Sequence, residues 1–112
     1  MIYHFCPRVE WERAVAAGRY TTGSLATQGF IHCSPREHLH VSATERARGR
    51  TDLVVLEIDE TLLGEATVWE EGDPPHPEGR LFPHVYDPIP VGAVVTVREL
   101  PPAPDGSFPP LD

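Results

Sequence analysis

The sequence predicts a small α+β domain with two helices near its beginning and mainly strands after them. Its 112 residues fit one domain, which we place at residues 1–100. Apolar residues make up 40% and charged residues 23% of the chain, which is typical of a globular protein. The third observation is the order of local patterns, which runs strand, helix, loop, strand, helix and then a series of strands.

The opening residues predict a strand and a helix. Residues 2–5 are aromatic and β-branched, as in a strand. Pro7 suits the first position of a helix and Gly18 suits its end, so we expect a helix over residues 7–17. Residues 19–29 are small and polar without periodicity, and we expect a loop there.

A second strand and a second helix are expected next. Residues 30–33 (Phe-Ile-His-Cys) predict a strand. Residues 34–37 form a capping-box pattern, with Ser first, Pro next and Glu three positions after the Ser. We therefore expect a helix from this point to about Arg48, ended by Gly49.

The second half of the chain predicts a structure rich in strands. Residues 53–58 are continuously apolar up to Glu57, which predicts a central strand covered on both faces. Further strands are expected at residues 67–70, 81–86 and 93–100. Residues 71–80 are too rich in proline and glycine for a regular element. Residues 101–112 contain five prolines, and we expect this tail to be disordered.

Charge and cysteine content limit the expected partners and location. Nine basic against seventeen acidic residues give a formal net charge of -8, so we expect neither long nucleic acid nor a membrane as partner. Cys6 and Cys33 lack the spacing of a metal motif and the density of a disulfide scaffold, which indicates reduced thiols. With no signal-peptide pattern and no apolar run of about 18 residues, we expect a cytoplasmic protein, either a monomer or a weak dimer.

Three of the six histidines are the main candidates for a functional site. His4, His32 and His84 each lie in or beside a predicted strand with bulky apolar neighbours. When such strands pair, the imidazoles can converge on one sheet face and donate hydrogen bonds or move protons near neutral pH. The alternative is structural, with each ring bonded to backbone or partly exposed. His38 and His40 lie two residues apart on a predicted helix, do not share a face, and are expected on the surface.

Other side chains give weaker signals. A zinc site built from the same three histidines with Glu70 is an alternative, but no paired-ligand motif such as HExxH is present and we predict no metal. Ser24 and Thr27 have hydroxyls that can hold a ribose or an amide, or can make local turn bonds. Glu57 and Glu70 follow apolar residues and can project into a site, although solvation at the surface is the default for both.

Four segments together resemble a known family. They are Ile2-Tyr3-His4, residues 24–34 (SLATQGFIHCS), Leu56-Glu57-Ile58-Asp59 and Phe82-Pro83-His84-Val85-Tyr86. In this order, over about residues 2–100, the chain resembles the small bacterial proteins of domain of unknown function family 952. The resemblance implies an ADP-ribosyltransferase-like fold, in which a split, mostly antiparallel sheet forms a cleft that holds NAD.

The resemblance also implies roles for individual residues. His4 corresponds to the first-strand residue that hydrogen-bonds the ribose and the nicotinamide amide of the ligand. His32 corresponds to the polar residue of the second motif, and Ser24 and Thr27 line the cleft beside it. His84 stands at the third motif, where many ADP-ribosyltransferases have a glutamate that stabilises the oxocarbenium ion. The segment around His84 contains no carboxylate, which is a departure from that pattern.

The expected function is the binding of NAD or a related small nucleotide, with transfer or hydrolysis of ADP-ribose as the reaction. His32 and His84 are the expected catalytic residues, and Tyr20 or Tyr86 is expected to stack on the nicotinamide ring. A protein is the expected acceptor in a transfer reaction. One alternative is a non-catalytic module that binds a nucleotide or a protein in the same cleft, and another is a His-ligated, metal-dependent hydrolase.

Overall fold

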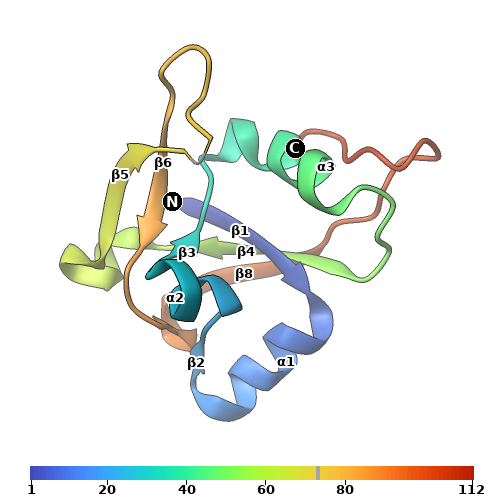
Figure 1. The fold of residues 1–112 in the computed structure, drawn as a ribbon. Helices are drawn as coiled ribbons and strands as arrows, with labels where there is room; N and C mark the ends of the chain where they lie inside the picture. The colour runs from blue at the N-terminus through green and yellow to red at the C-terminus, as the bar shows by residue number, and fades with distance from the viewer. Residues whose placement is uncertain (73) are drawn as a thin grey trace.

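The computed structural model describes residues 1–72 and 74–112, so residue 73 of the predicted break at 71–80 lies outside the described residues. The elements in chain order are β1 (Ile2–Pro7), α1 (Arg8–Ala17), β2 (Arg19–Tyr20), α2 (Gly23–Gln28), β3 (Ile31–His32), η1 (Arg36–His38), α3 (Leu39–Ala47), β4 (Leu53–Ile58), η2 (Glu60–Ala66), β5 (Thr67–Glu71), β6 (Leu81–Val85), β7 (Ile89–Pro90), η3 (Val91–Ala93) and β8 (Val94–Glu99). The elements η1 to η3 are short 3-10 helices. Every strand pairing in the described part of the chain is antiparallel (Figure 1). The predicted class, a small α+β domain, is confirmed.

The sheet β1-β4-β8 forms the centre of the molecule, with β4 between its two partners (Figure 1). In its register His4 lies opposite Leu56, and Glu57 lies opposite Thr96. All residues of β4 except Glu57 are buried. The continuous apolar run of this strand predicted a central position covered on both faces, and the structure confirms that prediction.

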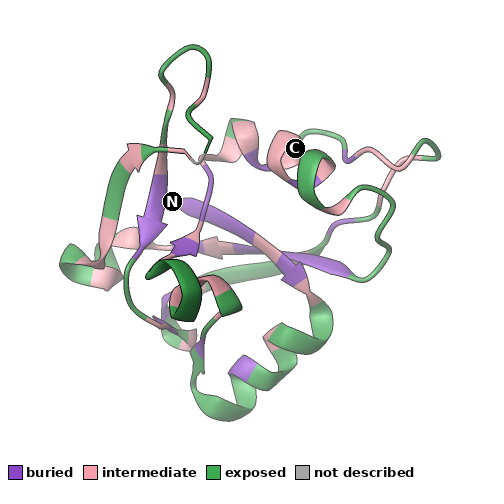
Figure 2. Ribbon diagram, viewed as in Figure 1, coloured by how far each residue is buried: buried purple, intermediate pink, exposed green. Residues whose placement is uncertain are grey.

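Two apolar cores lie on opposite faces of this sheet, whose central strand β4 is buried along most of its length (Figure 2). Side chains alternate along a strand, so Val54 and Leu56 enter the first core while Val55 enters the second. The first core is covered by residues of α1, β2, β3, β6 and β7. The second core is covered by α3, through Leu39, and by the C-terminal segment, through Phe108.

A second sheet, β3-β6-β5, and a two-stranded pair, β2-β7, complete the strands that the structure describes. In the second sheet His32 lies directly opposite His84, and His84 lies opposite Val68 on its other side. The two three-stranded sheets meet where Tyr3 and Ser34 exchange main-chain hydrogen bonds of 2.8 and 2.7 Å. The strands that carry His4 and His32 are therefore held side by side.

The first helix was predicted correctly, and the start of the second was not. The structure has α1 directly after Pro7, and Gly18 (φ 85°) ends it. The capping box expected at residues 34–37 is wrong, because the Ser34 hydroxyl contacts Ser42 (Oγ to Oγ 3.3 Å) and the α-helix begins only after η1. None of the helices in residues 1–72 and 74–112 combines the length and apolar character needed to cross a bilayer.

Residues 19–29, expected as a loop, contain the short strand β2 and the helix α2. The Thr22 hydroxyl oxygen accepts a hydrogen bond from the Leu25 amide (3.3 Å) and caps the start of α2. Gly29 (φ 90°) ends the helix in the left-handed conformation. The pattern went unrecognised because six residues are too few to show a helical period.

Residues 101–112 form neither helix nor strand, yet they lie against the domain. Phe108 is only 2% exposed, and its amide donates to the Thr44 hydroxyl at 2.9 Å. Gly49 and Gly106 are joined by a main-chain hydrogen bond of 2.9 Å. This placement differs from the disorder expected of a proline-rich tail, because one aromatic side chain fills a gap in the second core.

Candidate functional site

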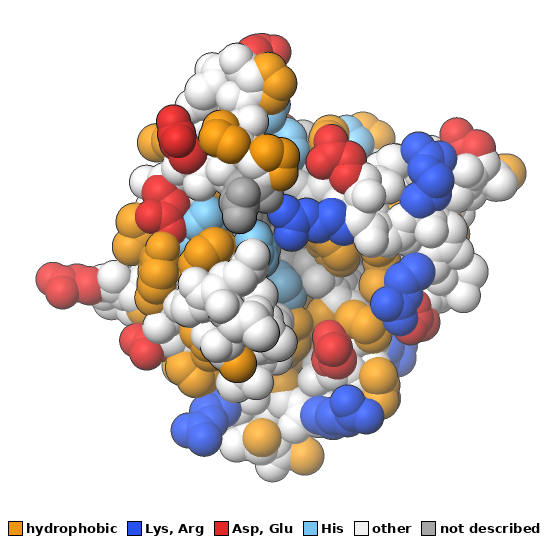
Figure 3. All heavy atoms as spheres, in the orientation of Figure 1, with side chains coloured by type: hydrophobic (Ala, Val, Ile, Leu, Met, Phe, Trp, Pro, Cys, Tyr) orange, Lys and Arg blue, Asp and Glu red, His pale blue; other side chains and the backbone are white. Residues whose placement is uncertain are grey.

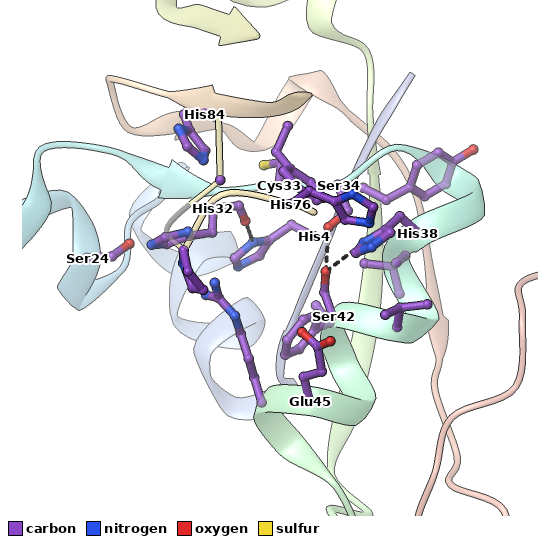
Figure 4. Close-up of a pocket in the computed structure, with 18 of the residues that line it drawn as sticks. His4, Ser24, His32, Cys33, Ser34, His38, Ser42, Glu45, His76 and His84 are labelled. Carbon is purple, nitrogen blue, oxygen red and sulfur yellow. Dashed lines mark hydrogen bonds between the residues drawn. The ribbon is translucent and has the colours of Figure 1, made fainter. Parts of the chain in front are cut away.

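A cavity of about 570 Å³ is bounded by strands of both three-stranded sheets and by α3. Its lining includes Tyr3, His4 and Phe5 of β1, His32 of β3, Phe82 and His84 of β6, Ser42, Glu45 and Arg46 of α3, and residues 74–77. Figure 3 shows histidine side chains gathered on this face beside an arginine, and Figure 4 shows how the labelled side chains lie around the cavity. A volume of this size is typical of sites for small organic ligands.

His4 is buried, and both of its ring nitrogens have partners within the protein. Nδ1 lies 2.5 Å from the main-chain oxygen of His32, and because a carbonyl oxygen only accepts, Nδ1 is the donor (Figure 4). Nε2 lies 2.7 Å from the Tyr20 hydroxyl and accepts from it in the neutral ring. Burial lowers the pKa of His4 to about 4. His4 thus ties β1 to β2 and β3, and its ring forms part of the cavity wall without an unused nitrogen.

His84 and Glu70 form an imidazole–carboxylate pair across β5 and β6. The distance from His84 Nδ1 to Glu70 Oε1 is 2.7 Å, and the Tyr86 hydroxyl donates to the same carboxylate oxygen. The bonds from Tyr86 and His84 lower the pKa of Glu70 below its ordinary value. An ionised carboxylate only accepts, so Nδ1 of His84 donates and Nε2 is the nitrogen that can take up a proton. This geometry suits general base catalysis.

Phe30 packs against both imidazoles of the second sheet. Its ring centroid lies 4.1 Å from that of His84, with the planes 19° apart, and 4.8 Å from that of His32. The centroids of His32 and His84 are 5.5 Å apart, and Nε2 of His32 lies 2.6 Å from Gln28 Oε1. The structure therefore brings together the two residues that were expected to be catalytic. His4 joins them at the same cavity from the other sheet, not from one shared sheet face.

His38 and His76 stand together at the outer part of the cavity with Phe82. The ring centroids of His38 and Phe82 are 4.9 Å apart, and those of His38 and His76 are 5.6 Å apart. Burial and the charge of Arg80 lower the pKa of His38. His38 was expected on the surface, and its partial burial at the cavity wall corrects that expectation.

The two hydroxyl residues expected at the site have different positions. Ser24 lines the cavity, where its hydroxyl donates to the main-chain oxygen of Phe30 at 2.7 Å. Thr27 is exposed and not part of the lining, and its hydroxyl donates to the Gly23 carbonyl at 3.0 Å within α2. Thr27 thus makes the local bond that was the alternative to ligand contact.

Neither tyrosine expected to stack on a ligand lines the cavity. Tyr20 is 1% exposed in the first core, its hydroxyl is bonded to His4, and burial raises its pKa. Tyr86 is 41% exposed and is held by Glu70 and Phe30. The aromatic rings that the cavity does present belong to Tyr3, Phe5 and Phe82.

The two thiols and the possible metal ligands give no reactive centre. Cys6 and Cys33 are unpaired and buried, and burial raises the pKa of Cys6 to about 11 and also raises that of Cys33. Raised thiol pKa values indicate low nucleophilicity. Within residues 1–72 and 74–112, no group of three or more His, Cys, Asp and Glu side chains could hold a metal ion, so the zinc alternative gains no support.

Sequence reasoning missed the residues of α3 that line the cavity, among them the polar residues Ser42 and Arg46. Ser42 and Arg46 lie four residues apart, and His38 lies four residues before Ser42, so the three follow one helix face. That spacing is visible in the sequence. It becomes a signal only once the face is known to turn toward a cavity and not toward solvent.

The fold and this cavity define a small α+β domain with a histidine-lined cavity. Residues 5–97 match the model of a family described as a protein of unknown function (DUF952), and the chain belongs to that family. It is similar to the crystal structure of protein CC0527 from Caulobacter crescentus, with 34% identity and a TM-score of 0.87 over 96% of this chain and 92% of that one. The solution NMR structure of CC0527 matches with 34% identity and a TM-score of 0.79, over 95% and 89% of the two chains. No curated protein matches the chain.

Proposed function

We propose that the protein binds NAD, or a related nucleotide, in this cavity and cleaves the bond between nicotinamide and ribose. The observation that carries the proposal is the His84–Glu70 pair, placed beside His32 at the cavity wall. The proposal includes an ADP-ribosyltransferase-like fold, supported by two antiparallel sheets that both contribute to the cavity. It rests otherwise on the resemblance of the four segments described above.

The lining of the cavity is compatible with a nucleotide. Aromatic rings of Phe5 and Phe82 offer apolar surfaces for the nicotinamide or adenine ring, and Ser24 offers a hydroxyl to the ribose. Ligand sites typically combine such apolar walls with a few polar groups that fix orientation. The formal charge of -8 favours a small ligand or a protein acceptor over long nucleic acid.

The His84–Glu70 pair supplies the proton acceptor that the reaction needs. When the bond between nicotinamide and ribose breaks, its electron pair leaves with neutral nicotinamide and the ribose carbon becomes an oxocarbenium ion. Water or an acceptor hydroxyl forms the new bond to that carbon and gives its proton to Nε2 of His84. Glu70 stabilises the resulting imidazolium through Nδ1, at the 2.7 Å contact. Glu70 thus contributes, through His84, a carboxylate that the third motif itself lacks.

The test is a pair of measurements with NAD: its protection of the protein against thermal unfolding, and the release of free nicotinamide. We expect protection and release with the unaltered protein. Glu70→Gln keeps the shape of the side chain but cannot stabilise the imidazolium as an anion, so it should retain protection and lose about 100-fold in release. His40→Gln, at a histidine outside the cavity lining, is the control and should behave as the unaltered protein.

Each other outcome separates the proposal from its alternatives. Protection without release indicates a binding module that does not turn NAD over. Release that survives in Glu70→Gln contradicts the role of the pair. If NAD gives no protection and no nicotinamide is released, NAD is not the ligand.

We also propose a cytoplasmic location and a monomer or weak dimer. The two buried, unpaired thiols support a reducing compartment.

A further inference from the structure

One wall of the cavity carries a row of polar side chains from a single helix face. His38, Ser42 and Arg46 follow one another at intervals of four residues along η1 and α3, and all three line the cavity. The Ser42 hydroxyl lies 3.2 Å from Nδ1 of His38 and 3.3 Å from the Ser34 hydroxyl (Figure 4). In Figure 4 His38 and Ser42 lie toward one side of the labelled set and His84 toward the other.

The charge of Arg46 is not neutralised within the described part of the chain. Its guanidinium takes part in none of the ion pairs or side-chain hydrogen bonds found there, whereas Arg8, Arg50, Arg80 and Arg98 each pair with a carboxylate. Glu45 lines the same cavity but forms no ion pair with Arg46. The positive charge of Arg46 is one of the causes, smaller than burial, that lower the pKa of His4. The Arg46 guanidinium is therefore available to pair with an anionic group of a ligand.

The other polar side chains on this wall of the cavity suit anions with several oxygens. Ser34 is 5% exposed and Ser42 is partly buried, so their hydroxyls are held at fixed positions beside the cavity. Guanidinium groups bind phosphate and carboxylate oxygens through two parallel N–H donors, and hydroxyl donors extend such a site. The His38 ring next to Ser42 adds a donor that becomes positively charged on protonation.

We propose that Arg46 and Ser42, with His38 beside them, form an anion subsite that binds a phosphate group of the ligand. This inference rests on the proposed function, and it narrows the preferred ligand class to nucleotides, with nucleosides and free bases binding more weakly. The ligand then spans the cavity, with its phosphate at α3 and its reacting bond at His84 and His32. For NAD the phosphate is the pyrophosphate that joins its two halves.

Calorimetric titration with matched ligands tests the subsite. Nicotinamide mononucleotide is compared with nicotinamide riboside, and AMP with adenosine, because each pair differs only by one phosphate. We expect the phosphorylated member to bind roughly 10- to 100-fold more tightly, as one charge-assisted hydrogen bond would give. Arg46→Gln should abolish this preference while leaving the affinity for the nucleosides unchanged, and Arg46→Lys should restore part of it.

The control variant is Arg19→Gln, at an exposed arginine on β2 that does not line the cavity. It removes the same charge from the molecule and should keep the full preference for phosphate. A preference that persists in Arg46→Gln, or that falls equally in Arg19→Gln, overturns the subsite.

Inorganic pyrophosphate separates failure of the subsite from failure of the proposed function. Pyrophosphate binding that Arg46→Gln abolishes, with no binding of any nucleotide, supports the anion subsite and contradicts the nucleotide proposal. Equal affinities for nucleosides and nucleotides contradict the anion subsite but remain consistent with nucleotide binding in the cavity. No binding of either pyrophosphate or nucleotides contradicts both.

Discussion

His4 and His84 show how partners decide what a buried histidine can do. Both residues are at most 9% exposed, and both line the cavity. His4 has a carbonyl oxygen on one nitrogen and the Tyr20 hydroxyl on the other, which fits a neutral ring that holds strands together. His84 has a carboxylate on Nδ1, which fits the role of proton acceptor that we propose for it. Residue type alone did not distinguish these two roles.

The lowered pKa of His4 predicts that the protein loses stability in mildly acidic solution. The pKa is about 4 in the folded state and near 6.5 in the unfolded chain, so between these pH values only the unfolded state takes up the proton. The free energy of unfolding therefore falls as the pH drops from 6.5 to 4, by about 1.4 kcal/mol per pH unit and about 3 kcal/mol in total. Urea denaturation at a series of pH values measures this slope.

The variant His4→Gln should flatten this slope between pH 6.5 and 5. It should also be less stable by about 2 kcal/mol at pH 7.5, because buried partners of both ring nitrogens lose their bonds. Carboxylates with a lowered pKa, such as Glu70, change the free energy of unfolding mainly below their ordinary pKa of 4.5. Between pH 6.5 and 5 the slope therefore comes from the histidines. His38→Gln is the control. The pKa of His38 is also lowered, but His38 is less buried than His4, so this variant should keep most of the slope. A full slope in His4→Gln would show that other groups cause it.

At the scale of elements, α2 connects chain geometry with the site. It places Ser24 at the cavity and Gln28 on Nε2 of His32, and it ends at Gly29, directly before Phe30. The return of the chain after Gly29 is what brings Phe30 onto the two imidazoles of the second sheet. The left-handed conformation of Gly29 thus sets the path of the chain from α2 to Phe30.

The same substitution at the two ends of α2 should have opposite effects on stability. Gly29 has φ 90°, where an alanine costs about 1 to 2 kcal/mol although nothing lies within 4 Å of the added methyl group. Gly23 lies in the helix with the same open space and without a positive φ, so Gly23→Ala should stabilise by about 0.4 to 1 kcal/mol. Thermal and urea denaturation of the two variants check the signs. Equal effects would contradict the assigned end of the helix.

The strands with strong local patterns could be predicted from the sequence, whereas the elements that form the site depended on distant partners. The apolar runs of β4 and β8 and the Pro7 and Gly18 signals of α1 are local, and they were found. The helix α2, capped locally by Thr22, is too short to show a helical period, and the pairing of Glu70 with His84 depends on how β5 and β6 meet. The sequence identified His32 and His84, but their common cavity with His4 depends on how two sheets meet.

For the whole molecule, the central sheet makes the two cores depend on each other. Strand β4 gives alternate side chains to the two cores, so loss of one core removes support from the same backbone that holds the other. Phe108 closes the second core from a segment without regular structure. We therefore expect the chain to unfold in one cooperative transition.

Phe108→Ala tests this coupling with a probe in the opposite core. Trp69→Phe leaves Trp11, which packs against the first core, as the sole tryptophan. In that background Phe108→Ala should lower the free energy of unfolding by about 3 kcal/mol, and the Trp11 fluorescence transition should move together with that of circular dichroism. Pro110→Ala, at an exposed position of the same segment, should change neither. A disordered tail would make Phe108→Ala silent, and separate transitions would show that the cores unfold independently.

The pairing of β5 with β6 has a consequence for how this protein can vary in length. His84 meets Glu70 and His32 through the register of strands that are only five and two residues long. One residue inserted into β6 ahead of His84 would turn that side chain to the opposite face and separate it from both partners. An insertion in the connection between the two strands leaves the ladder intact and changes only the rim of the cavity formed by residues 74–77. Gains and losses of residues between β5 and β6 are therefore compatible with the site, while those inside the strands dismantle it.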